Sequence, residues 1–158
     1  MGAEGGGSGV GVRITVLGPG DVPVLSRVAD GVFDGPVRTD LVQTFLSDPR
    51  HHLVVALDGD VVVGMASGVH YVHPDKDPEL WINEVGVAPG YHRRGIGRRL
   101  IEGLLRRGRD LGCREAWVLA EGGNGPARRL YETAGGVPSP DPVVMYSFPL
   151  PAAGPGDR

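Results

Sequence analysis

The chain has 158 residues, of which 41% are hydrophobic, and a formal net charge of −3 at pH 7. This length suits a single domain with a core of its own, and the slight negative charge argues against a general nucleic-acid-binding protein. The single cysteine, Cys113, excludes an internal disulfide and a cysteine-only zinc site. We find neither an apolar run long enough for a membrane span nor a signal peptide, and we therefore expect a cytoplasmic protein with no membrane partner and no nucleic-acid partner.

The two ends of the chain differ from its middle in composition. Much of the excess of glycine and proline, which number 27 and 14 in the whole chain, lies in residues 1–11 and 151–158. Segments of this kind bury too little apolar surface to offset the entropy of ordering them. We therefore expect flexible tails at 1–11 and 151–158, on either side of one folded domain at 12–150.

In chain order, the first predicted elements are a strand and two helices. Residues 12–17 alternate in character, which indicates a strand. Asp21 is suited to cap a helix, and the apolar stripe after it predicts a helix that ends near Phe33; the stripe consists of Val22, Leu25, Val28 and Ala29. A second helix is predicted at 38–46, with three apolar residues directed inward: Leu41, Val42 and Leu46.

A β-hairpin is predicted next. Residues 53–57 and 61–66 are rich in β-branched and apolar residues, and Asp58-Gly59-Asp60 between them is a strong hairpin signal. The second strand is expected to continue to Val72. The loop at 73–79 then combines two prolines with three carboxylates. This loop is either a specificity loop or a solvated hairpin tip.

The stretch at 80–105 combines a strand, a turn and the start of a helix. The strand at 80–87 ends at Ala88-Pro89-Gly90, and the apolar residues that follow Gly95 fall on one helix face. The first N–H groups of a helix lack internal partners, and the helix dipole adds positive charge at that end. Gly95 and Gly97 allow an anion to approach the backbone, and four nearby arginines add charge: Arg93, Arg94, Arg98 and Arg99. The turn predicts a diphosphate seat; the alternative is a surface helix with a solvated, basic first turn.

The second half of the chain continues with a strand, a helix and a strand. Residues 115–120 predict a short buried strand. Asn124 is suited to cap the next helix, whose inner face carries Ala127, Leu130, Tyr131 and Ala134. Residues 143–148 predict a last strand. The element order βααβββαβαβ predicts an α/β (α+β) domain, in which a mixed central β-sheet has helices on both faces.

Two motifs resemble those of the GNAT N-acetyltransferase superfamily. The first is Val87-Ala88-Pro89 followed by His92-Arg93-Arg94-Gly95-Ile96-Gly97, which is similar to the acyl-CoA signature Gln/Arg-x-x-Gly-x-Gly/Ala. His92 stands where Gln or Arg is usual. The second is Asn124-x-x-Ala127-x-x-Leu130-Tyr131-Glu132-x-x-Gly135, with Gly136 where the superfamily commonly has Phe. The resemblance implies a single-domain GNAT fold, in which the central strand splays from the next parallel strand, and acetyl-CoA as the cofactor.

The resemblance also implies roles for the residues around the signature. The pantetheine arm is expected in the gap beside the central strand, and the diphosphate on the Gly-rich turn. The implied cofactor-binding residues are Val85, Gly86, Val87, His92, Arg93, Arg94, Gly95, Ile96, Gly97, Arg98, Asn124 and Tyr131. Gly86 itself indicates either a bulge or a close backbone approach by the ligand. Asn124 is expected to bond the pantetheine, to cap the helix, or to do both.

Acetyl transfer to an amine needs a base, because an alkylamine with a pKa near ~10.4 is mostly protonated at neutral pH. Glu84 is the candidate base, acting directly or through water, because acidic residues occupy this place in many members of the superfamily; the alternative is a structural pair with an arginine. Tyr131 is the candidate acid for the leaving thiolate, or else a core aromatic. No covalent enzyme intermediate is needed. We expect no metal, because the histidines lack a recognised ligand spacing.

Four stretches are the helix end near Phe33, the hairpin at 53–64, Glu84-Val85-Gly86-Val87, and residues 91–104. In these stretches the sequence most resembles, within the superfamily, the aminoglycoside 3-N-acetyltransferase-like branch. The resemblance implies an aminoglycoside or other aminosugar as the small-molecule acceptor, bound by acidic residues: Asp34, Asp75, Asp77, Glu84 and Glu121. For Asp34 the alternative is a helix cap or a solvated loop residue. Alternative acceptors are a polyamine, a small metabolite amine, or a protein N-terminus or lysine. A non-catalytic acyl-CoA sensor is a further alternative. The oligomeric state stays open, with a homodimer as one alternative.

Overall fold

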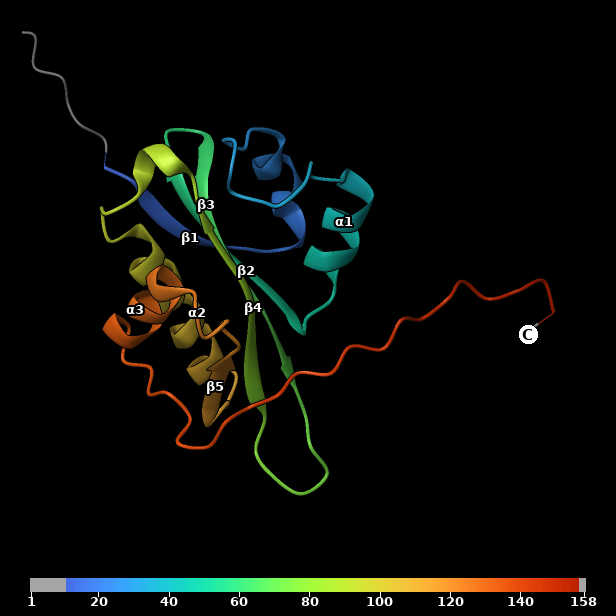
Figure 1. Ribbon diagram of the computed structural model, residues 1–158. Coiled ribbons are helices and arrows are strands. Elements are labelled where there is room, and N and C mark those ends of the chain that lie inside the picture. The colour runs from blue at the N-terminus through green and yellow to red at the C-terminus, as the bar shows by residue number, and fades with distance from the viewer. Residues whose placement is uncertain (1–10, 157–158) are drawn as a thin grey trace, which may run out of the picture.

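The computed structural model describes residues 11–156, which contain a five-stranded sheet (Figure 1). The sheet order is β1-β2-β3-β4-β5, and the strands are Arg13–Leu17, His51–Asp58, Val61–Tyr71, Glu79–Val87 and Glu115–Val118. Neighbours from β1 to β4 are antiparallel, whereas β5 runs parallel to β4. The predicted mixed sheet and the hairpin at Asp58-Gly59-Asp60 are confirmed. Residues 1–10 and 157–158, which include most of the first predicted tail and the end of the second, lie outside the described residues.

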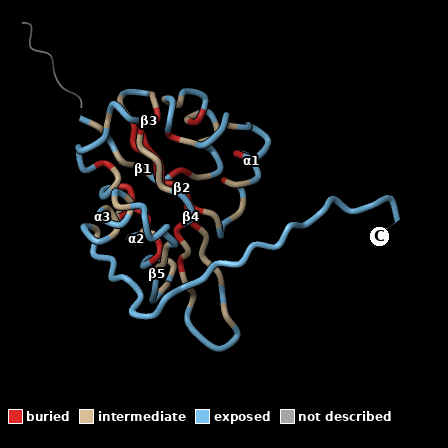
Figure 2. The backbone as a smooth tube through the Cα atoms, in the orientation of Figure 1, coloured by how far each residue is buried: buried red, intermediate tan, exposed pale blue. Residues whose placement is uncertain are grey.

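Helices cover both faces of the sheet, as predicted. On one face lie α1 (Thr39–Ser47) and the 3-10 helix η1 (Pro19–Ser26), and on the other lie α2 (Ile96–Asp110) and α3 (Gly125–Thr133) (Figure 1). Alternation along the strands supplies two apolar cores. Val55 and Leu57 pack toward α1, whereas Val54 and Ala56 pack toward α2. Figure 2 shows the buried residues concentrated along the central strands. In the described part of the chain, no helix has the length and apolar character needed to cross a membrane.

The first predicted helix is wrong over its second half. The structure has the short 3-10 helix η1 followed by irregular chain. Pro23 within η1 has no N–H to donate, and its ring obstructs a continuous α-helix. Further along, Val28 forms a bridge to Val62: the Val62 N–H donates to the Arg27 carbonyl and the Ala29 N–H donates to the Val62 carbonyl, each at 2.9 Å. Pairing with the sheet thus replaces the predicted helical turns.

The predicted last strand is also wrong. Residues 137–156 form no strand, and they run along the outside of the molecule and then away from it (Figure 1). Pro138, Pro140 and Pro142 lie between α3 and the predicted strand, and because each lacks an N–H, strand pairing cannot extend through this stretch. The large apolar side chains of this segment are exposed: Val137, Val143, Val144, Met145, Tyr146, Phe148 and Leu150. Within residues 11–156, β4 is therefore the sole strand partner of β5.

Candidate active site

The central strand β4 loses its parallel neighbour halfway along its length. Its pairing with β5 ends at Ile82, opposite Val118, which is the last residue of β5. From residue 83 to Val87, β4 pairs with β3 alone among the described strands. This loss of pairing occurs where the strand splay was predicted. It leaves one edge of the β4 backbone open to pair with an extended ligand.

A β-bulge at Asn83 decides which residues of β4 face which side of the sheet. Ser67 of β3 stands opposite Glu84, but the next residue of β3 stands opposite Ile82, so Asn83 is the additional residue. Ile82 packs in the core under α2, and strict alternation would direct Glu84 to the same side. Because the bulge reverses the alternation, Val85 packs under α2 and Glu84 faces the side of α1.

A cavity of about 460 Å³ beside the open edge brings the predicted base and acid together. Both Glu84 and Tyr131 line it, as do Asp34, His92 and residues 85–87. Glu84 is exposed, whereas Tyr131 is half-buried. Burial raises the pKa of the Tyr131 phenol, so this group carries its proton at neutral pH. The cavity therefore contains a proton acceptor and a proton donor.

The turn before α2 has the geometry of an anion seat. Gly95 is the N-cap of α2 with φ 72°, a left-handed conformation that glycine adopts without strain. The first bond of the helix runs from the Arg99 N–H to the Gly95 carbonyl at 3.1 Å, and the three N–H groups between them have no acceptor in the described residues. A Cβ on Gly95 would meet no atom within 4 Å, so the space next to this backbone is open. Arg93, Arg94 and Arg98 are exposed around it. These donors and charges fit a diphosphate.

Side-chain contacts hold this turn against the end of β4. His92, which replaces the usual Gln or Arg, donates from Nε2 to the Val87 carbonyl at 2.8 Å. No role at the turn was predicted for Tyr91. Its hydroxyl donates to the Asp58 carboxylate, which raises the pKa of Tyr91, and the Arg94 guanidinium lies 4.9 Å from its ring centroid. Asp58 is 33 residues away in the sequence, so no local signal could have revealed this contact.

Two glycines have packing roles that the sequence did not predict. A Cβ on Gly86 would overlap the carbonyl oxygen of Val32, so this glycine admits the chain's own loop. The bulge predicted at Gly86 lies at Asn83. A Cβ on Gly97 would lie 3.1 Å from the Leu130 side chain of α3, so Gly97 allows α2 and α3 to pack closely.

Asn124 caps α3, which confirms one of its two predicted roles. Its Oδ1 accepts a hydrogen bond from the Ala127 N–H at 3.1 Å. This cap begins the helix that carries Tyr131 to the cavity.

Three of the five acidic residues predicted to bind the acceptor lie away from Glu84. Asp75 and Asp77 are on the loop between β3 and β4, at the opposite end of β4 (Figure 1). Asp77 faces Arg114 at 3.8 Å. Glu121 follows β5 and is exposed, and none of these three residues lines the cavity. From this set, the structure brings Asp34 and Glu84 together.

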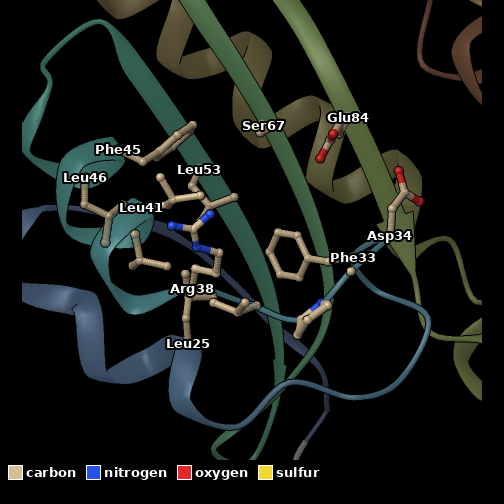
Figure 3. A pocket seen from close by; sticks show the side chains of 14 residues that line it. Leu25, Phe33, Asp34, Arg38, Leu41, Phe45, Leu46, Leu53, Ser67 and Glu84 are labelled. Carbon is tan, nitrogen blue, oxygen red and sulfur yellow. The ribbon is translucent and has the colours of Figure 1, made fainter. Parts of the chain in front are cut away.

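A second cavity, of about 300 Å³, adjoins the first (Figure 3). It lies between α1, the loop before α1 and the sheet, and it shares Asp34 and Glu84 with the first cavity. One of its lining residues was predicted to face the protein interior, namely Leu41. In the structure Leu41 lines this cavity and remains 53% exposed.

Two of the five histidines form a pair inside the fold. His52 Nε2 and His70 Nδ1 are 2.7 Å apart. Burial, followed by the nearby His70, lowers the pKa of His52 to about 4, so its ring is neutral at pH 7. In residues 11–156, no group of three or more His, Cys, Asp or Glu side chains is arranged to hold a metal ion.

Comparison with known sequences identifies related proteins. The sequence profile described as the Acetyltransferase (GNAT) family matches residues 26–135. N-alpha-acetyltransferase RimI of Mycobacterium tuberculosis is 40% identical over 60 residues, which are 38% of this chain and 37% of RimI. The chain thus spans little more than a third of the length of this curated relative.

Two solved structures share the fold. A crystal structure of an aminoglycoside acetyltransferase from an uncultured soil metagenomic sample, in complex with sisomicin, has a TM-score of 0.77 at 20% identity, and the match covers 89% of this chain and 97% of that one. AAC(6')-Iy in complex with a bisubstrate analog has a TM-score of 0.71 at 18% identity, with 89% and 99% covered. At these identities the likeness concerns the fold.

Proposed function

The chain belongs to the GNAT acetyltransferase family, and from this premise we propose that it transfers the acetyl group of acetyl-CoA to a primary amine by direct attack in a ternary complex. The observation that carries the proposal is the convergence of three features at the cavity of about 460 Å³. These features are the open edge of β4, the turn before α2, which reaches the cavity through Pro89 and His92, and the side chains of Glu84 and Tyr131. They serve cofactor binding, proton removal and proton donation.

The chain fits acetyl-CoA at two places. The open edge of β4 at 83–87 offers extended backbone groups, which suit the amide groups of a pantetheine arm. The N–H groups after Gly95, with Arg93, Arg94 and Arg98 around them, suit the diphosphate. When bound, acetyl-CoA supplies an activated acyl thioester. The cofactor-binding residues predicted from the sequence stand as part of this proposal, with Gly86, Gly97 and Asn124 acting through packing and capping.

We propose Glu84 as the base. It lines both cavities, so its carboxylate can accept a proton from an ammonium group that enters from the side of α1, directly or through one water. The nitrogen lone pair is then free to attack. Among the described residues no arginine forms an ion pair with Glu84, which favours this role over a structural pair.

We propose Tyr131 as the acid that protonates the leaving thiolate. Its ring packs against the core under α2, and the residue also lines the cavity. Packing therefore fixes the ring while the raised pKa keeps the phenolic proton available.

For the acceptor, we propose a small-molecule amine. An aminoglycoside or other aminosugar is supported by the fold neighbour that was solved in complex with sisomicin and by AAC(6')-Iy. Asp34 and Glu84 suit one of its ammonium groups, but Asp75, Asp77 and Glu121 lie elsewhere. A polyamine, a metabolite amine and a protein N-terminus or lysine are the alternative acceptors.

We also propose a homodimer formed through residues 137–150. The apolar side chains of this segment are exposed, up to 90% at Leu150, and the outer edge of β5 has no strand partner within residues 11–156. Addition of residues 143–148, which contain no proline, to β5 of a second copy would cover both the exposed apolar side chains and the open edge of β5. In such a dimer, the segment of one copy would complete the sheet of the domain at 12–150 in the other copy. Light scattering should give twice the monomer mass of 16.6 kDa, and a chain ending at Gly136 should be monomeric. A monomeric full-length chain would contradict the dimer.

The acetyl transfer is tested by thermal unfolding with and without acetyl-CoA, followed by CoA-thiol release with a panel of amines. Acetyl-CoA should stabilise the wild type, because a ligand that binds only the folded state raises its stability. Glu84→Gln should keep this stabilisation and lose most of the turnover. Glu132→Gln makes the same charge change at an exposed position of α3 and should keep both. The absence of a thermal shift at saturating acetyl-CoA would contradict the cofactor, and full turnover of Glu84→Gln would contradict the base.

A further inference from the structure

The cavity beside α1 is apolar over most of its wall (Figure 3). Its apolar lining includes Leu25, Phe33, Val37, Leu41, Phe45 and Leu53. Leu41 and Phe45 are four residues apart on α1, so both project from one face of the helix. Because Leu41 is 53% exposed, this apolar surface is accessible to a ligand.

Negative charge is confined to one end of this cavity. Asp34 and Glu84 lie together on the side away from α1, as Figure 3 shows, where the two cavities meet. The charged residue on the α1 side is Arg38, and it pairs with Asp40 at 2.8 Å. Among the described lining residues there is no third carboxylate. The cavity thus has an anionic end and an apolar body.

We infer that the acceptor is a primary amine carried on an alkyl or aryl group. Its ammonium group lies at Asp34 and Glu84, and its apolar body lies against Leu41 and Phe45. This inference rests on the proposed acetyl transfer and names the substrate class of the same site. The volume of about 300 Å³ is at the lower end of the range for small-molecule sites, so the apolar group is compact.

A polycationic acceptor fits this cavity less well. One ammonium group finds two carboxylates, but each further ammonium group would lose water against an apolar wall without a partner, which is costly. An alkyl or aryl group, by contrast, gains free energy when the same wall removes it from water.

A series of linear alkylamines tests the inference, because a longer chain adds apolar area while the reacting amine stays the same. Burial of one methylene group corresponds to about a fourfold change in affinity. The kcat/KM for acetylation should therefore rise by about fourfold per carbon from ethylamine to hexylamine and level off once the cavity is filled. Phenethylamine should exceed spermidine and sisomicin in kcat/KM by about tenfold or more.

Two variants show whether this cavity is responsible. Leu41→Glu places a carboxylate in the apolar wall at a position exposed enough to tolerate it. It should flatten the dependence on chain length and raise kcat/KM for spermidine relative to hexylamine, while the thermal shift with acetyl-CoA stays unchanged. Val16→Glu is the matched control, since Val16 is 44% exposed and stands opposite Val54, on the face of the sheet toward α2. It should leave the series unaltered.

The possible outcomes separate this inference from the acetyl transfer itself. A flat alkylamine series combined with faster acetylation of spermidine or sisomicin would overturn the apolar acceptor and leave acetyl transfer standing. An identical slope in Leu41→Glu would overturn the assignment to this cavity. No CoA release with any amine would overturn the acetyl transfer on which the inference rests.

Discussion

Two substitutions at Gly95, the N-cap of α2, separate the stability of the turn from its anion binding. At φ 72° an alanine is strained by about 1–2 kcal/mol, but its Cβ meets no atom within 4 Å. Gly95→Ala should therefore lower the melting temperature by roughly 2–8 °C. Gly95→Glu carries the same strain, and its negative charge at the helix N-terminus recovers about 0.3–1 kcal/mol. Without ligand, the Glu variant should be at least as stable as the Ala variant.

Acetyl-CoA should reverse this order. At a concentration of about 100 times Kd, a ligand stabilises the folded state by about 2.7 kcal/mol, which corresponds to a rise of roughly 5–10 °C. A carboxylate about 4 Å from a phosphate charge costs about 4 kcal/mol at an effective dielectric constant of about 20, or roughly a 10³-fold loss of affinity. Gly95→Glu should therefore show no shift at an acetyl-CoA concentration that still stabilises Gly95→Ala.

Differential scanning fluorimetry with and without acetyl-CoA measures both effects. Gly20→Glu is the control, because a Cβ on Gly20 also meets no atom within 4 Å and the residue lies in η1, away from the turn. A full thermal shift for Gly95→Glu would refute the diphosphate seat. An equal loss of the shift in Gly20→Glu would show that net charge alone accounts for the effect.

Tyr131→Phe should lower turnover about 100-fold while the thermal shift with acetyl-CoA stays the same, because the ring still packs; wild-type CoA-thiol release would leave Tyr131 with packing alone. Asn124→Ala removes the cap of α3 and should lower the free energy of unfolding by about 1 kcal/mol in urea titrations, and an unchanged midpoint would argue against the cap. Because the pKa of His52 falls from its ordinary 6.5 to about 4 in the fold, the unfolded chain binds more protons between these values. Stability should therefore fall as the pH drops from 6.5 to 4, by on the order of 3 kcal/mol, and His52→Gln should flatten this profile; a wild type without pH dependence in this window would contradict the assignment.

The features predicted correctly from the sequence depend on residues that are neighbours in the chain. The turn at Asp58-Gly59-Asp60 and the cap at Asn124 act within a few residues, so their signals are local. The helix after Gly95 follows from its own apolar stripe, which packs under the sheet. Local chemistry of this kind was sufficient to place the strand, turn and helix at the candidate site.

The features that were missed depend on contacts between distant segments. Val28 pairs with Val62 of β3, and only the folded sheet shows that this pairing replaces a helix. The bulge at Asn83 depends on the register between β3 and β4. The sequence of β4 alone does not reveal this register. Asp75 and Asp77 were expected beside Glu84, but a loop at the start of β4 lies at the far end of the strand from the site.

The bulge at Asn83 has a consequence for how the sequence at this site can change. The side of the sheet that residue 84 faces depends on the number of residues between it and the packed Ile82, whatever its chemical identity. Point mutations can therefore alter the group presented to the acceptor, but they leave it on the same side. Deletion of the one residue at position 83 would direct the side chain of residue 84 into the core under α2. A library of substitutions at position 84 thus varies the side chain that faces the α1 side of the sheet. A library of single-residue insertions and deletions at position 83 varies which side of the sheet residue 84 faces.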